Sequence, residues 1–139
     1  MSDKKFADSN VLVYAFDGSD SKKQNIAQNL FKKEGSQGKL IISTQVLQEF
    51  FVVVTRKLSK PLSVDEAYNA VYNFAEYPLV QIDKDLILRA IKRSDSDSVS
   101  FWDALIIEAA LQSDCETLLS EDMQSGRKID GLTIVNPFY

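Results

Sequence analysis

The chain has 139 residues, of which 45% are apolar and 26% charged, a balance typical of one compact folded domain. It contains no histidine and a single cysteine, which excludes Ser-His-Asp and Cys-His nucleophiles, histidine-bound or cysteine-rich zinc, and RNA cleavage by a histidine acid/base pair. The formal net charge of −4 argues against strong electrostatic binding of nucleic acid, unless divalent cations held by clustered acids reverse the sign locally.

Hydrolytic chemistry in this chain would therefore use carboxylates, lysines and hard metal ions. No segment approaches the run of about 20 apolar residues that spans a bilayer. Residues 1–5 are charged and precede no apolar stretch with a small-residue cleavage site, so they do not resemble a signal peptide. We expect a cytoplasmic protein without membrane contact, folded as one domain over residues 1–139.

Short β-type runs occur at 5–7, 40–43, 79–82, 117–119 and 133–135, and the stretches between them have helical periodicity. This alternation predicts an α/β fold, a single-domain α/β/α sandwich around a mostly parallel central sheet. Ligands of such sheets bind beyond the carboxyl ends of the strands, so polar residues directly after the strands are the candidates for a site.

The first two long helices are predicted from apolar stripes that are expected to lie in the core. The stripes consist of Ile26, Ala27, Leu30 and Phe31, and of Val46, Leu47, Phe50, Phe51 and Val54. A third helix begins with a capping box formed by Ser63 and Glu66 and continues through Phe74, before Pro78 favours an extended chain.

Two further helices are predicted in the second half of the chain. Asp83 caps a helix through Arg93, whose inward residues are expected to be Leu86, Ala90 and Ile91. Residues 94–98 have the composition of a loop, and a helix marked by Trp102, Leu105, Ile106, Ala109 and Ala110 follows.

Four acidic residues from distant parts of the chain are predicted to meet at the carboxyl edge of the sheet. Asp8 and Asp122 follow the apolar residues of the first and fourth strands, Glu49 lies about one turn into its helix, and Asp103 stands near the start of another. Clustered carboxylates raise one another's pKa unless a cation neutralises them. The grouping therefore predicts a site for Mg²⁺ or Mn²⁺, where a bound water could attack a phosphate.

Each of these acids also has a structural interpretation. Asp8 and Asp103 fit helix N-caps, and Asp122 fits a turn residue, in which case neighbouring Glu121 would be the ligand instead. Glu49 is harder to explain structurally, because it lies in the most apolar helix. The combination of the four, rather than any single residue, favours the metal site.

Segments 6–14, 42–50, 100–106 and 118–126 together resemble the PIN-domain family, and more closely the VapC-type toxin ribonucleases of toxin–antitoxin pairs. The resemblance covers nearly the whole chain. It implies that Asp8, Glu49, Asp103 and Asp122 are the catalytic, metal-binding acids. It also implies supporting polar positions that capping or turn formation would explain equally well, namely Asn10, Ser43 and Ser120.

The resemblance implies a metal-dependent endoribonuclease that cleaves RNA with metal-activated water, the toxin of a toxin–antitoxin pair. Such proteins usually form homodimers and are held inactive by an antitoxin protein. Four aromatic residues with helical spacing are candidate anchors for either contact, although core packing also explains them: Phe50, Phe51, Tyr68 and Tyr72.

Two alternatives remain open. One is a catalytically silent PIN-like interaction module. The other is a phosphatase or receiver domain, since both place an aspartate after the first strand. However, the dehalogenase-type phosphatase pattern needs a second aspartate where Asn10 stands, and a receiver domain needs a phosphorylated aspartate where Asp83 is expected to start a helix.

Overall fold

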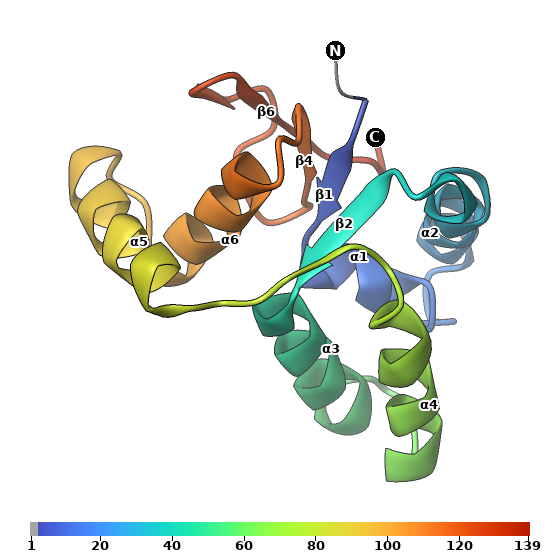
Figure 1. The fold of residues 1–139 in the computed structure, drawn as a ribbon. Helices are drawn as coiled ribbons and strands as arrows, with labels where there is room; N and C mark the ends of the chain where they lie inside the picture. Colours follow the sequence, from blue (N-terminus) through green and yellow to red (C-terminus); the bar gives the residue numbers. More distant parts are fainter. Residues whose placement is uncertain (1–2) are drawn as a thin grey trace.

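The computed structural model describes residues 3–139, which form a six-stranded sheet with helices on both sides (Figure 1). The strands are β1 (Lys5–Ala7), β2 (Leu40–Ser43), β3 (Leu79–Val80), β4 (Thr117–Leu119), β5 (Lys128–Ile129) and β6 (Leu132–Val135). Their order is β3-β2-β1-β4-β6-β5, and all neighbours are parallel except β5 and β6. The predicted α/β fold with a mostly parallel sheet is confirmed.

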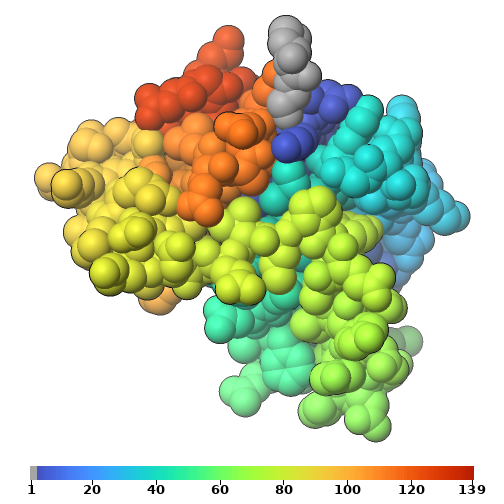
Figure 2. Space-filling model, in the orientation of Figure 1, coloured from blue at the N-terminus to red at the C-terminus, as the bar shows by residue number. Residues whose placement is uncertain are grey.

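The helices lie around the sheet and leave polar residues at the carboxyl ends of its strands. They are α1 (Ser9–Tyr14), α2 (Ser21–Lys33), the 3-10 turn η1 (Gly35–Gln37), α3 (Thr44–Arg56), α4 (Val64–Phe74), α5 (Lys84–Ser96) and α6 (Phe101–Gln112). Figure 1 shows α5 and α6 on one side of the strands, α2 on the other, and α3 and α4 below the carboxyl ends of β1 and β2. In the same view, the space-filling model shows α4 projecting from the lower part of the molecule (Figure 2).

Local sequence determines where most helices begin, because a polar side chain accepts a hydrogen bond from the first turn of each. These capping residues are Asp8, Asp20, Ser43, Ser63, Asp83 and Ser100. The predicted capping box of Ser63 and Glu66 and the predicted cap at Asp83 are confirmed. Strands β1 and β2 thus lead directly into capped helices, and polar residues come to lie at the carboxyl edge.

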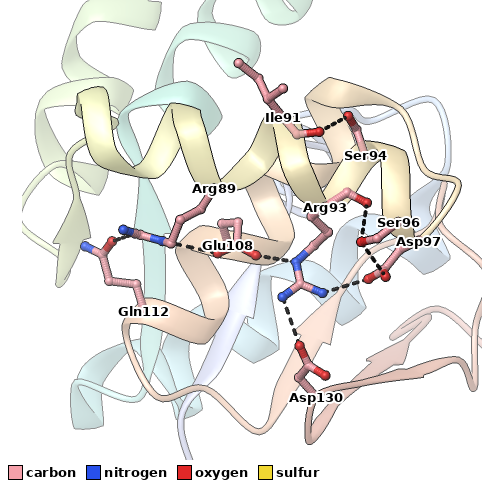
Figure 3. Close-up of polar contacts among 9 residues, drawn as sticks. All are labelled: Arg89, Ile91, Arg93, Ser94, Ser96, Asp97, Glu108, Gln112 and Asp130. Atoms are coloured by element: carbon pink, nitrogen blue, oxygen red, sulfur yellow. Dashed lines mark hydrogen bonds and ion pairs between the residues drawn. The ribbon is translucent and has the colours of Figure 1, made fainter.

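Helix α5 differs from the prediction at its end and on its exposed face. It continues to Ser96, so part of the predicted loop 94–98 is helical, and Arg93 pairs with Asp97 one turn later at 2.7 Å. Arg93 also binds Glu108 on α6, which turns this face of α5 toward α6 (Figure 3). Ile91 lies off that face and is 51% exposed, so its predicted burial was wrong.

Three smaller differences have local causes. Phe51 lies beside the buried stripe of α3 rather than on it, and is exposed. The third strand ends at Val80 because the N–H of Ile82 donates to the Thr44 hydroxyl instead of to the sheet. The sequence analysis missed β5, which pairs with β6 through a two-residue Asp130–Gly131 turn with φ of 50° and 89°.

The core is one cluster of buried apolar residues on both faces of the sheet, with Phe6, Leu12, Ile42 and Phe50 among its fully buried members. Tyr68 and Tyr72 do not join it: they lie exposed on α4 with ring centroids 6.4 Å apart. Within residues 3–139, no helix has both the length and the apolar character that crossing a bilayer requires.

Candidate active site

Asp8 is the most buried acid at the carboxyl edge of the sheet, with 7% exposure. Its carboxylate accepts hydrogen bonds from the Ser9 N–H at 2.7 Å and from the Ser120 hydroxyl at 2.8 Å. Burial, with a smaller contribution from the negative charges of Glu49 and Asp122, raises the pKa of Asp8 to about 6 despite these two donors. Asp8 is therefore both the cap of α1 and a carboxylate surrounded by like charge.

Asn10 and Ser120 join Asp8 to the loop that follows β4. The Asn10 amide nitrogen lies 3.4 Å from Asp8 Oδ2 and 3.2 Å from Asp122 Oδ2, while Asn10 Oδ1 accepts from the Glu121 N–H at 3.1 Å. The Ser120 hydroxyl, which donates to Asp8, accepts from the Asp122 N–H at 3.2 Å. These two polar side chains hold Asp8 and Asp122 on the same side of the edge.

Glu49 is held from within its own helix. Gln45, 5% exposed, donates from Nε2 to Glu49 Oε2 at 3.3 Å and to the backbone carbonyl of Trp102 at 3.2 Å. Because both partners only accept, the amide orientation is fixed, and its carbonyl Oε1 is buried with no hydrogen-bond partner. Gln45 thus bridges α3 to the start of α6.

Asp103 lies in the first turn of α6, where Ser100 rather than Asp103 is the cap. The Ser100 hydroxyl accepts from the Asp103 N–H at 3.1 Å. Burial raises the pKa of Asp103, with a smaller contribution from the charge of Asp122. The N-cap interpretation therefore does not hold for Asp103, whereas Asp8 does cap α1.

One pocket of about 450 Å³ brings together all four predicted acids. Asp8, Glu49, Asp103 and Asp122 line it, with Lys57 as the one cationic side chain among its lining residues. Ser43 is fully buried and caps α3 through the Val46 N–H at 3.3 Å, so it supports the helix rather than lining the pocket.

Glu121, the alternative to Asp122, is directed elsewhere. Its carboxylate accepts a hydrogen bond from Tyr14 at 2.7 Å and forms an ion pair with Lys23 of α2. Asp122 lines the acidic pocket and Glu121 does not. Neighbouring acids in one loop are thus divided between the pocket and an ion pair.

The oxygen-only donors of this pocket suit a hard divalent cation such as Mg²⁺ or Mn²⁺. Burial raises the pKa of Asp8 and of Asp103, and neighbouring acids add a smaller contribution; a bound cation would favour the ionised carboxylates. In the arrangement described for residues 3–139, however, no three His, Cys, Asp or Glu side chains are close enough together to hold one ion. These oxygen donors suit a metal ion, and the carboxylates would have to move closer together to bind one.

Among the lining residues that the sequence analysis did not place in the site are Gln45, Trp102 and Lys57. Gln45 has a sequence signal, since it lies four residues before Glu49 on one helical face. Trp102 was interpreted only as marking a helix, and Lys57 was assigned no role in a site. Their place in the pocket depends on how α3 and α6 approach each other, which no local pattern reports.

Comparisons with known proteins agree with this architecture. The model of the PIN domain family matches residues 5–129. No curated protein sequence matches the chain. Among solved structures, a toxin–antitoxin complex from Klebsiella pneumoniae is similar with a TM-score of 0.69 and 16% identity, covering 96% of this chain and 98% of that one.

Two further structures have the same fold. VapC20 of Mycobacterium tuberculosis, described as a toxin that cleaves the sarcin-ricin loop, has a TM-score of 0.68 at 15% identity and covers 86% of this chain and 90% of its own. DNA-bound VapBC from Salmonella typhimurium has a TM-score of 0.64 at 16% identity, covering 96% and 97%. PIN-domain proteins are nucleases, and the family match spans the strands and helices that carry the four acids. The chain belongs to the PIN domain family.

Proposed function

We propose that this protein is a metal-dependent endoribonuclease of the VapC type, the toxin of a toxin–antitoxin pair, folded as one domain over residues 1–139. The observation that carries the proposal is the single pocket lined by Asp8, Glu49, Asp103 and Asp122 in a PIN-family fold. The similar structures include a toxin that cleaves RNA and complexes of toxins with antitoxins. The absence of histidine removes the common metal-free route to RNA cleavage.

In this proposal the four acids hold Mg²⁺ or Mn²⁺, which when bound activates water and stabilises charge on the departing oxygen. Asn10 and Ser120 keep Asp8 and Asp122 facing the same space through their hydrogen bonds. Gln45 fixes the orientation of Glu49. The protein contributes orientation and a site for the cation, and the attacking group is water.

Partners follow from the same proposal. RNA is the substrate, an antitoxin protein blocks the pocket, and a second copy completes a homodimer in the cytoplasm. The alternative of a silent interaction module conflicts with the retention of four acids in one pocket. For the phosphatase alternative, Asn10 stands where a second aspartate is needed, and its amide nitrogen bridges two carboxylates instead.

The test is incubation of the purified protein with total RNA in Mg²⁺, in Mn²⁺ and in EDTA, followed by mapping of the cut ends. We expect cleavage only with metal, leaving 5′-phosphate and 3′-hydroxyl ends. Asp8→Asn should lower the rate at least about 100-fold, whereas Asp95→Asn, an exposed acid on α5, should not change it.

Cyclic 2′,3′-phosphate ends, or cleavage that persists in EDTA, would contradict the mechanism. Calorimetric titration with Mn²⁺ gives a readout independent of activity. If wild type bound no metal and cut no RNA, the silent module would be the better explanation. Trapping by beryllofluoride would favour the phosphatase or receiver alternative.

A further inference from the structure

The acidic pocket also has apolar lining residues. Trp102, Val52, Val53 and Ile106 line it together with the carboxylates. The side chain of Trp102 is 63% exposed, although residues 104–110 of its helix α6 are buried. Val52, on α3, is 43% exposed. Exposed apolar side chains grouped beside a polar site are typical of a binding surface.

The indole of Trp102 is supported where it stands. The backbone carbonyl of Trp102 accepts the Gln45 hydrogen bond at 3.2 Å, which ties this residue to α3. Its ring lies edge-to-face against Phe101, with centroids 5.3 Å apart and planes at 66°. The backbone of Trp102 is thus tied to α3, and its ring packs against the neighbouring ring in α6.

Lys57 adds a positive charge to the pocket rim. It lines the pocket, and no ion pair found among residues 3–139 includes it. Carboxylates, an exposed aromatic ring and a cation in one pocket match the parts of an RNA strand, in which bases and neighbouring phosphates flank the phosphodiester that is cut.

We propose that Trp102, with Val52 beside it, is a stacking site for one nucleobase of a single-stranded RNA, and that Lys57 binds a phosphate of the same strand. This inference rests on the proposed ribonuclease function and adds the substrate form. A base can stack on an indole only when one of its faces is free, so unpaired RNA binds here and duplex RNA does not. Removing an aromatic stacking partner weakens single-strand binding by about tenfold or more.

The chain provides its own probe, since Trp102 is its only tryptophan. We would titrate full-length Asp8→Asn, which should bind without cutting, with a single-stranded RNA oligomer, an abasic oligomer of equal length, and duplex RNA. The single strand should quench the Trp102 fluorescence, while the abasic and duplex forms should not. Equal quenching by the abasic oligomer would overturn the stacking site.

Variants separate stacking from folding. In the Asp8→Asn background, Trp102→Ala should weaken binding of labelled single-stranded RNA about tenfold, and Trp102→Phe should restore most of it. Tyr139→Ala removes another exposed aromatic ring, outside the pocket, and should change nothing. Lys57→Gln should weaken the single strand and the abasic oligomer alike.

The outcomes distinguish this inference from the proposed function. If wild type cleaves RNA but Trp102→Ala binds RNA normally, the stacking site is wrong and the nuclease stands. If RNA quenches Trp102 but wild type never cleaves, the binding site stands and the nuclease is wrong. Quenching by an apolar peptide but not by RNA would assign Trp102 to a protein partner and overturn the inference.

Discussion

At Asp8, burial and hydrogen bonding act on one carboxylate in opposite directions, and burial dominates. Its pKa rises from the ordinary 3.8 to about 6, so the folded protein holds a proton that the unfolded chain releases. The contribution of Asp8 to the free energy of unfolding is fully present below pH 3.8, and it is lost as the pH rises through about 6. The ionised carboxylate then costs on the order of 3 kcal/mol without metal.

We therefore predict that Asp8→Asn becomes more stable relative to metal-free wild type as the pH rises from 4 to 7. The measurement is urea unfolding of both proteins in EDTA at several pH values. Repeating the series in Mg²⁺ is the control, because a bound cation should remove most of the difference. A difference independent of pH would show that burial of the charge is not the cause.

Gln45 keeps a buried acceptor without a partner, a cost of roughly 1–3 kcal/mol, while its Nε2 orients Glu49. We predict that Gln45→Leu lowers kcat about tenfold and weakens Mn²⁺ binding, because Glu49 is no longer oriented. The free energy of unfolding should change little, because the substitution also removes the unpaired buried oxygen of Gln45. Cleavage kinetics, metal titration and urea unfolding measure the three quantities. Gln48→Leu is the matched control, because Gln48 lines the same pocket and its side chain forms no hydrogen bond within residues 3–139.

At the scale of elements, α2 and the loop after β4 are joined by Lys23, Tyr14 and Glu121. The Lys23 ammonium pairs with Glu121 and lies 4.9 Å from the centre of the Tyr14 ring. The hydrogen bond to Glu121 raises the pKa of Lys23, which favours the charged ammonium. This contact turns Glu121 away from the pocket and leaves Asp122 facing it.

This division predicts different results for two neighbouring substitutions. Glu121→Gln should keep the cleavage rate within about threefold, because Gln still accepts the Tyr14 hydrogen bond, whereas Asp122→Asn should lower it at least about 100-fold. Single-turnover cleavage and Mn²⁺ titration of the two variants provide the comparison. If both variants failed equally, Glu121 would be acting at the metal site.

At the scale of the whole molecule, a network of charges joins α5, α6 and the turn between β5 and β6 (Figure 3). Arg93 binds the nearly buried Glu108, and also Asp130 at 2.9 Å and Asp97 at 2.7 Å. Arg89 pairs with the second oxygen of Glu108 at 3.3 Å. Removing one partner of such a buried pair leaves an uncompensated charge.

We predict that Arg93→Met lowers the free energy of unfolding by about 3 kcal/mol, measured by urea unfolding, because Glu108 loses its main partner. Combining Arg93→Met with Glu108→Leu should recover much of this loss, since no buried charge then remains unpaired. Lys92→Met, on the exposed side of α5, should have little effect. A double variant as unstable as Arg93→Met alone would show that packing rather than charge dominates.

Local patterns in the sequence were sufficient for most of the architecture. The runs at 5–7, 40–43 and 117–119 are strands with those bounds, and the caps at Ser63 and Asp83 start the expected helices. The missed strand β5 had a usable signal, the Asp-Gly pair at its turn. Phe51 and Ile91 were misplaced because helical periodicity identifies an apolar stripe but not how wide a strip the neighbouring element covers.

The sequence by itself determined most strands and helices in chain order, and it placed four acids just beyond strand ends or in the first two turns of helices, because periodicity and capping depend on neighbouring residues. Only the tertiary structure decided that Glu121 faces Lys23, 98 residues away, and that Gln45 reaches Trp102, 57 residues away. Those choices depend on which surfaces of distant segments approach each other. Burial of apolar surface and attraction between unlike charges determine that approach. Both depend on contacts between distant segments, which form only when the chain folds.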